Sequence, residues 1–335
     1  MKGIGIAVLG YGRIGRIHAD NVRAFPGAHL VAVSDPELGA GLQPPADVPW
    51  SKEAGSIIAD PAVEAVMICT PTPTHAALVE AAASAGKHVF CEKPLDLDPA
   101  VAARTVRAAE RAGVFLQIGF NRRFDPSFRR VRDAVQSGEI GALCMLRVVS
   151  RDPAPPPIEY VRSSGGLFLD MMIHDFDMVR FVSGQEVEEV QAFGAVHIDP
   201  RIGEAGDVDT AVVSLRLASG ALATIENSRR AVYGYDQRLE AFGVDGAIEA
   251  GNRTASTTWL KRAEGVRSES PLHFFTERYE VAYRLELAAF VETIRNGSEP
   301  ECNGRDALPP LAIAVAARRS LESGRPEPVL AAGAE

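Results

Sequence analysis

The sequence predicts an α/β domain built on a doubly wound parallel sheet, residues 1–121, followed by an α+β domain with a large, mostly antiparallel sheet, residues 122–335. Three observations support this. The first third of the chain alternates short apolar runs with helical patterns, as successive βαβ units do. A glycine-rich turn joins the first apolar run to the first helical pattern. Later in the chain, short runs of period two are separated by turn residues such as Ser219-Gly220.

Composition excludes several classes of protein. The chain has 335 residues, which is enough for two domains, and a net charge of −9 without a long like-charged run, which argues against a nucleic-acid or anionic membrane surface. No apolar run reaches membrane-spanning length. The chain enters its first strand without a signal-peptide pattern. The cysteines, Cys69, Cys91, Cys144 and Cys302, have no metal-type spacing, and we expect reduced residues in a cytoplasmic protein.

The first strand and the loop after it indicate a dinucleotide site. Ile4–Leu9 is apolar throughout, as strands buried on both faces are, and Gly10-Tyr11-Gly12-Arg13-Ile14-Gly15 follows it directly, before a helical pattern. The first glycine allows a tight turn, the second lets the backbone approach a pyrophosphate, and the third lets the helix pack against the strand. The helix N-terminus would then face the phosphates. The alternative is a tight turn without a nucleotide.

An acidic residue stands at the distance that this motif requires. Asp35 closes the second strand, residues 29–34, where a carboxylate accepts from the ribose hydroxyls and repels a 2′-phosphate. The sequence therefore predicts NAD in preference to NADP.

Two further strands end in unusual loops. Thr70–His75 follows the strand at 65–69, and its prolines and hydroxyls suit contacts to ribose or nicotinamide, although its threonines would also serve as plain helix caps. Glu92-Lys93-Pro94 follows the strand at 88–91, which places the lysine at the carboxyl edge of the sheet, where ligands bind; the alternative is a solvated surface lysine. A helix from Pro99 to Ala112 and a strand at 115–118 complete the domain. The expected cofactor-binding residues are Gly10, Gly12, Arg13, Ile14, Gly15, Asp35, Thr70, Thr72, Pro73, His75, Glu92 and Lys93.

A buried helix is expected in the second domain, from about Leu167 to Val182, because the segment is hydrophobic nearly all round. It nevertheless carries Asp170, His174 and Asp177, which fall within about 60° of one another at about 100° per residue. A carboxylate one turn from an imidazole orients the ring and tunes it for proton transfer. The alternative is a structural Asp–His pair inside a core.

The rest of the second domain contains strands and two long helices. A helix ends near Gln136, and helices are expected at about 277–296 and 306–323. The proline run at 153–157 predicts a rigid loop, and the alternative is a surface spacer. Tyr233–Arg238 is a loop rich in rings and hydrogen-bonding groups, as polyol sites are, and the alternative is a loop whose tyrosines cover the core edge. One face of a broad sheet must be covered, either by helices or by another subunit, so an oligomer is expected. The period-two runs, expected to form an antiparallel meander, are residues 187–197, 208–217, 221–227, 238–242 and 246–249.

With these motifs together, the sequence resembles the Gfo/Idh/MocA oxidoreductases over essentially its whole length. The motifs are the glycine loop, Glu92-Lys93-Pro94 and the helix with Asp170 and His174. Within the family it is most similar to the members that oxidise inositol, through residues 150–160, 173–177 and 233–238. The resemblance implies a Rossmann domain that binds NAD, and a homotetramer built through the second domain's sheet.

The resemblance also implies roles for individual residues. Lys93, Asp170 and His174 would form the catalytic set, and myo-inositol or a close isomer would be oxidised to 2-keto-inositol. In that scheme His174 takes the hydroxyl proton, Asp170 orients its ring, and Lys93 stabilises the alkoxide. The imidazole and the nicotinamide are expected to meet across an interdomain cleft. The implied substrate-binding residues are Arg123, Asp152, Tyr160, Asp177 and Tyr235.

Other functions remain open at this stage. They are a dehydrogenase for another polyol or aldose, an NAD-dependent glycoside hydrolase on the same fold, and a non-catalytic sensor. A metal site made by His174, Asp175 and Asp177 is disfavoured because Asp175 lies off the shared face. A serine hydrolase is disfavoured because no GxSxG elbow is present.

Overall fold

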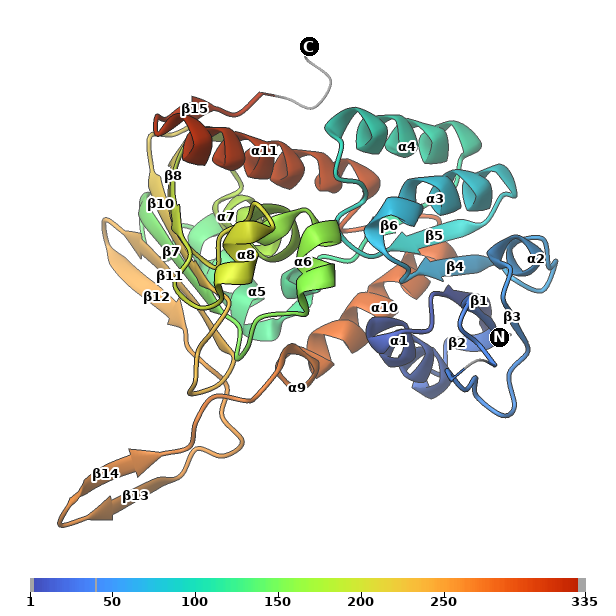
Figure 1. Cartoon of the computed structure of the whole chain (residues 1–335), viewed down its shortest axis with the longest axis horizontal. Coiled ribbons are helices and arrows are strands. Elements are labelled where there is room, and N and C mark those ends of the chain that lie inside the picture. The colour runs from blue at the N-terminus through green and yellow to red at the C-terminus, as the bar shows by residue number, and fades with distance from the viewer. Residues whose placement is uncertain (1–2, 40, 331–335) are drawn as a thin grey trace. The chain divides into compact units, whose positions relative to one another are not determined.

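The chain forms two compact units in the computed structural model, which describes residues 3–39 and 41–330 (Figure 1). Among these residues, unit 1 comprises the chain up to Asn121 together with Tyr283–Leu311, and unit 2 comprises Arg122–Ala282 with Ala312–Leu330. The first segment of unit 1 thus ends at Asn121. Residues 283–311, expected in the second domain, belong to unit 1, and residues 331–335 lie outside the described part. No helix in the described ranges is long and apolar enough to cross a membrane.

Unit 1 contains the predicted parallel sheet, with strand order β3-β2-β1-β4-β5-β6 and every pair parallel. The central strand β1 is buried along its whole length, which explains why its sequence is continuously apolar rather than alternating. The strands are β1 (Ile4–Leu9), β2 (Ala28–Ser34), β3 (Trp50–Ser51), β4 (Ala65–Ile68), β5 (His88–Cys91) and β6 (Leu116–Ile118).

Helices cover both faces of this sheet, with α1 and α10 on one side and α3 and α4 on the other (Figure 1). Ile6 and Val8 of β1 pack in one buried cluster with Leu287 and Phe290 of α10. The late helix α10 therefore supplies core side chains to the first domain. The helices of unit 1 are α1 (Arg13–Ala24), α2 (Ala54–Ile58), η1 (Thr72–Thr74), α3 (His75–Ser84), α4 (Pro99–Ala112), most of α10 (Glu280–Asn296) and η4 (Gly304–Ala307).

Unit 2 is built on a seven-stranded sheet of order β12-β11-β7-β10-β9-β8-β15. Strand β7 pairs in parallel with β10, and all other neighbours are antiparallel. The sheet is therefore mostly antiparallel, as predicted, but it is not a simple meander, because β7 is inserted between β11 and β10. The strands of this sheet are β7 (Leu143–Arg151), β8 (Val187–Ala195), β9 (Thr210–Leu217), β10 (Leu222–Ser228), β11 (Asp236–Gly243), β12 (Gly246–Ala250) and β15 (Glu327–Pro328).

Helices α5, α7 and α11 lie on one face of this sheet (Figure 1). The opposite face is exposed and carries Met145, Leu222 and Phe242, which are side by side in the strand register and each 44–51% exposed. The described helices of unit 2 are η2 (Asn121–Phe124), α5 (Pro126–Gln136), α6 (Ile158–Ser164), η3 (Leu167–Met171), α7 (Ile173–Ser183), α8 (Pro200–Glu204), α9 (Phe275–Arg278) and α11 (Leu308–Ser323), of which η2 and α11 begin in unit 1.

The buried helix expected from Leu167 to Val182 is present but is not one continuous α-helix. Residues Leu167–Met171 are π-helical, and the α-helix α7 begins at Ile173. A π-turn holds more residues than an α-turn, so the uniform 100° spacing that placed Asp170 on the face of His174 does not apply across Met172.

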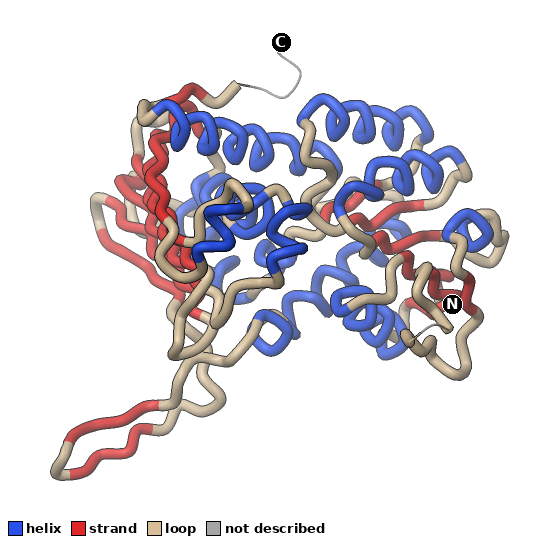
Figure 2. The backbone as a smooth tube through the Cα atoms, in the orientation of Figure 1, coloured by secondary structure: helices blue, strands red, loops and turns tan. Residues whose placement is uncertain are grey.

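A two-stranded hairpin, β13 (Trp259–Arg262) and β14 (Gly265–Ser268), projects from unit 2 at the end of two long connecting segments (Figure 2). Every residue of both strands is exposed. This hairpin contains none of the predicted site residues.

Candidate functional site

The glycine loop of unit 1 has the geometry that a dinucleotide site needs. Gly10 has φ +90°, and a Cβ at this position would lie 2.6 Å from the carbonyl carbon of Cys69. A Cβ on Gly15 would lie 1.9 Å from the Gly10 carbonyl oxygen, so the helix packs as closely as the motif requires. At Gly12 a Cβ would meet no atom within 4 Å, which leaves the backbone open to an approaching pyrophosphate.

Helix α1 begins directly behind this loop, with Arg13 and Ile14 in its first turn. Gly12 is its N-cap, no side chain caps it, and its first turn carries no acidic residue. The first N–H groups are thus left for an anion. Asp35 lies beside the loop, because the Tyr11 N–H donates to its Oδ2 at 2.8 Å. These residues fit a dinucleotide with free ribose hydroxyls.

His75 connects the two predicted strand-end loops. Its Nδ1 lies 2.8 Å from the Pro94 carbonyl oxygen and its Nε2 lies 2.7 Å from the Thr70 carbonyl oxygen. The ring is buried, and burial lowers its pKa while the two carbonyl contacts act in the opposite direction. The Thr74 hydroxyl also donates to the Thr70 hydroxyl at 2.6 Å. The loop with Thr72 and Pro73 is thereby tied to the loop that carries Lys93.

The second of these loops is fixed through Glu92. Its Oε1 lies 2.8 Å from Nε2 of His18, a fully buried residue of α1. Lys93 follows, partly exposed, and its peptide bond with Pro94 is cis. The Glu92–His18 contact joins the end of β5 to the helix behind the glycine loop, so the expected cofactor residues form one connected set in unit 1.

In unit 2, several predicted residues converge on a side chain that the sequence patterns did not single out. Asp170 receives hydrogen bonds from the Tyr160 hydroxyl at 2.9 Å and from Arg229 Nη1 at 3.0 Å. Arg229 Nη1 also lies 3.8 Å from Asp152 Oδ2. Burial raises the pKa of Asp152 to about 6, although Arg229 acts to lower it. Asp152, Tyr160 and Asp170, which come from three segments of the chain, therefore form a cluster around one guanidinium.

Arg123 and Asp177 pair with each other. Arg123 Nε lies 2.9 Å from Asp177 Oδ2, and Nη2 of the same guanidinium binds Oδ1; both side chains are buried. The neighbouring Arg122 binds Asp175, whose other oxygen accepts from the Asn227 amide at 2.8 Å.

Asp175 and Asp177 are thus each paired with an arginine. Within the described residues, no three His, Cys, Asp or Glu side chains lie close enough together to hold a metal ion.

Tyr235 lies next to β11 and is buried. Its burial is consistent both with a pocket wall and with the core. Its ring meets Tyr279 edge-on at 6.0 Å between centroids, and its pKa is raised well above the usual value by burial. Tyr279 and Arg229 are residues that sequence reasoning missed, since neither belongs to a short motif. His174 is partly exposed at the start of α7.

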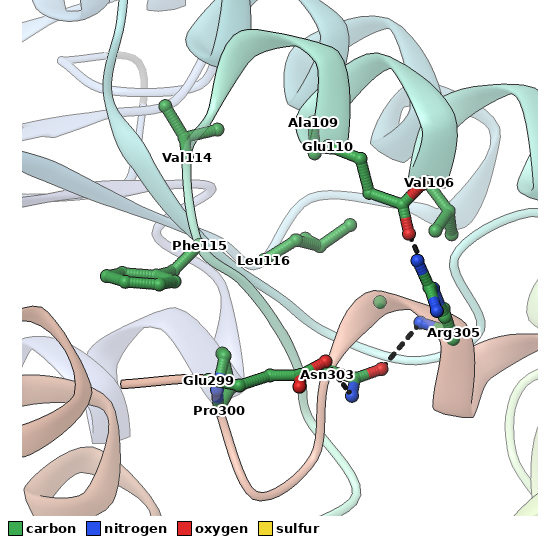
Figure 3. Close-up of a pocket in the computed structure, with 11 residues that line it drawn as sticks. Val106, Ala109, Glu110, Val114, Phe115, Leu116, Glu299, Pro300, Asn303 and Arg305 are labelled. Carbon is green, nitrogen blue, oxygen red and sulfur yellow. Dashed lines mark hydrogen bonds and ion pairs between the residues drawn. The ribbon is translucent and has the colours of Figure 1, made fainter. Parts of the chain in front are cut away.

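A pocket in unit 1 lies apart from all these residues (Figure 3). It encloses about 110 Å³ between α4, β6 and η4, and the Glu110–Arg305 ion pair, 2.6 Å long, closes one side. It contains none of the predicted site residues. The residues that line it are Val106, Ala109, Glu110, Val114, Phe115, Leu116, Glu299, Pro300, Asn303, Gly304 and Arg305.

Known proteins match this chain along nearly its whole length. A family model described as an oxidoreductase family with an NAD-binding Rossmann fold matches residues 4–120, and a Gfo/Idh/MocA C-terminal domain model matches residues 128–249. A myo-inositol 2-dehydrogenase of Thermotoga maritima is 49% identical over 96% of this chain and 97% of its own length.

Solved structures agree with these sequence matches. The crystal structure of a probable dehydrogenase from Thermotoga maritima has a TM-score of 0.92 at 48% identity, covering 97% of this chain and 99% of that one. A scyllo-inositol dehydrogenase from Lactobacillus casei, with bound NAD(H) and scyllo-inositol, has a TM-score of 0.89 at 30% identity and covers 98% and 99% of the two chains. The chain therefore belongs to the Gfo/Idh/MocA family of oxidoreductases, with an N-terminal NAD-binding Rossmann domain.

Proposed function

We propose that this protein oxidises myo-inositol, or a close inositol isomer, to 2-keto-inositol with NAD. The observation that supports this most strongly is the near full-length similarity, 49% identical, to a myo-inositol 2-dehydrogenase. The cluster of Asp152, Tyr160 and Asp170 around Arg229 adds a chemical reason, because a polyol needs several hydrogen-bonding groups at one place.

The proposed reaction removes a hydride from a ring carbon and a proton from its hydroxyl. NAD, when bound, supplies the hydride acceptor. His174 takes the hydroxyl proton, and Asp170 orients the ring and stabilises its charged form. Lys93 offsets the negative charge that develops on the alkoxide oxygen. The proposal therefore requires Lys93 of unit 1 and His174 of unit 2 to act on the same alcohol group.

The residues proposed to hold the polyol are Arg123, Asp152, Tyr160, Asp177 and Tyr235. The Asp152 residue is partly exposed and the Tyr160 residue is exposed, so both can reach a ligand. Arg123 and Asp177 enter as a bound pair, whose charges neutralise each other. The proposed cofactor residues are those connected in unit 1 around the glycine loop, Asp35 and the two strand-end loops.

The deciding experiment measures NADH formation at 340 nm with purified protein. The panel contains myo-inositol, scyllo-inositol, glucose and xylose, each with NAD and with NADP. We expect the highest kcat/KM with an inositol and NAD. Absence of NADH with every compound would refute the proposal, and cleavage of nitrophenyl glycosides without net NADH would identify an NAD-dependent glycosidase instead.

We propose further that the protein is a cytoplasmic homotetramer that self-associates through the exposed face of the unit 2 sheet. Met145, Leu222 and Phe242 form an exposed apolar cluster there, beside the Arg147–Glu226 ion pair. Light scattering during gel filtration should give four chains for the parent protein and fewer for Phe242→Asp. Recovery of the activity in the membrane fraction of lysed cells would contradict the cytoplasmic assignment.

A further inference from the structure

Arg229 is one of the largest fully buried side chains of the protein, with 2% of its surface exposed. It follows β10, and its backbone N–H donates to the Asp209 carbonyl oxygen at 2.8 Å, which fixes where the side chain starts. A buried guanidinium is costly unless it is paired with a charge. Its pairing within unit 2 therefore needs an explanation.

The carboxylates around Arg229 come from three segments. Asp170 of η3 accepts from its Nη1 at 3.0 Å, and Asp152, after β7, lies 3.8 Å from the same nitrogen. Asp207, after α8, also contributes to the electrostatic environment that raises the pKa of Arg229 against the effect of burial. The paired residues Arg122 and Asp175 both influence the pKa of Asp152 electrostatically, in opposite directions.

The pairing is poorly suited to stability alone. Nε and Nη2 of Arg229 are buried and have no hydrogen-bond partner among the described residues. Buried donors that are left unsatisfied cost free energy, and replacing a buried ion pair with packed apolar groups is often neutral or stabilising. A charge retained at that cost is better explained by what it does to its partner, Asp170.

Both carboxylate oxygens of Asp170 accept a hydrogen bond. The Tyr160 hydroxyl donates to Oδ1 and Arg229 donates to Oδ2, so the plane of the Asp170 carboxylate is set by α6 and by the segment after β10. A carboxylate bound to a guanidinium stays ionised and is a weak proton acceptor. Asp170 is therefore suited to act as an oriented negative charge rather than as a base.

We propose that Arg229 is a positioning residue of the dehydrogenase site: it keeps Asp170 ionised and oriented, and its positive charge keeps His174 ready to accept a proton. This inference rests on the proposed function of Asp170 and His174. The proposed role is one of positioning, because the guanidinium is 2% exposed and its closest carboxylate partner among the described residues is Asp170.

Three variants separate this role from simple packing. Arg229→Gln removes the charge, Arg229→Lys keeps it with different geometry, and Arg230→Gln changes the exposed neighbour as a control. The kcat/KM for myo-inositol is measured from pH 6 to 10 with saturating NAD. Circular dichroism and the melting temperature show whether each variant is folded. If Arg229→Gln does not fold, Arg229→Lys still tests the role of Arg229.

For Arg229→Gln we expect kcat/KM at pH 7 to fall by at least about tenfold and the acidic limb to move up by about one pH unit, because the protonated imidazole is no longer opposed by a cation. For Arg229→Lys the limb stays in place while the plateau falls. Arg230→Gln stays within twofold of the parent. An unmoved limb in Arg229→Gln would overturn the inference.

A second measurement does not depend on turnover. The imidazole resonances of His174 are assigned by comparison with His174→Gln and titrated by NMR. The His174 midpoint should move to higher pH in Arg229→Gln, and an unchanged midpoint would refute the electrostatic coupling. If the parent protein oxidises no inositol but the midpoint still moves, the electrostatic coupling of Arg229 to His174 is confirmed while its role in a dehydrogenase site is refuted.

Discussion

Arg123 and Asp177 bind each other through three hydrogen bonds in the interior of unit 2, with side-chain exposures of 6% and 1%. Removing one partner of a buried ion pair leaves the other charge uncompensated, which typically costs about 3–5 kcal/mol. We therefore expect Asp177→Asn to lower the free energy of unfolding by about that amount, measured by urea denaturation.

The exposed pair Arg130–Glu139 provides the matched control. Its side chains are 53% and 55% exposed, so Glu139→Gln should cost less than about 1 kcal/mol. Equal losses for the two variants would show that burial of Arg123 and Asp177 carries no penalty. The KM of the folded Asp177→Asn protein then tests the pocket role. If Asp177 contacts the polyol, loss of that contact should raise KM as well.

Replacement of the proposed proton-transfer groups should abolish most activity, and at His174 it should leave cofactor affinity unchanged. We expect His174→Gln and Lys93→Met each to lower kcat by about 10²–10⁴-fold, the range that general acid–base groups contribute. Calorimetric titration with NAD should give dissociation constants close to that of the parent protein for His174→Gln.

His29→Gln is the control for the histidine variant, since His29 is an exposed residue of β2. Its kcat should stay within about twofold of the parent. Retention of more than a tenth of the parent kcat in His174→Gln would remove His174 from the mechanism.

The parallel sheet of unit 1 could be predicted closely because its signals are local. The apolar run Ile4–Leu9 and the helix Pro99–Ala112 have the same bounds in the structure as in the sequence pattern. Strand β7 was missed because Val148, Val149 and Ser150 are all buried, so the strand lacks the alternation that marks a half-exposed strand. Its insertion beside β10 then turns the expected meander into a mixed sheet.

Short motifs allow candidate site residues to be named from the sequence, whereas residues placed by tertiary contacts cannot be named in this way. The spacing predicted that Asp35 lies near the glycine loop, and the structure shows the Tyr11 N–H donating to its carboxylate. Arg229 was missed because Asp152 and Asp170, its carboxylate partners, lie 77 and 59 positions away in the sequence. The π-helical turn at Leu167–Met171 has no sequence period that distinguishes it from an α-turn.

Cofactor choice should depend on Asp35. Asp35→Ser removes the charge that opposes a 2′-phosphate, so we expect the ratio of kcat/KM with NADP to that with NAD to rise at least about tenfold. The variant also loses the acceptor for the Tyr11 and Glu37 N–H groups, so its melting temperature should fall. Glu37→Gln, an exposed change two residues away, should leave the ratio unaltered; a shift there of equal size would point to general surface charge instead.

Asp152 should make the protein less stable as the pH rises. Burial raises its pKa to about 6 in the folded chain, with Arg229 acting in the opposite direction, whereas an unfolded aspartate titrates near about 3.9. Between these values the folded state binds the proton that the unfolded state has lost, so the free energy of unfolding falls with increasing pH and stays low above pH 6. For Asp152→Asn the free energy of unfolding should therefore rise by on the order of 2 kcal/mol at pH 7.5 and not at pH 4, measured by urea denaturation at both values.

The exposed Asp20→Asn should change stability by less than about 0.5 kcal/mol at either pH. An equal gain for Asp152→Asn at both pH values would exclude an ionised carboxylate as its source. Asp152 is also proposed to hold the polyol, so the stabilised variant should have a raised KM. This is the result expected when a destabilising carboxylate is retained because it binds the substrate.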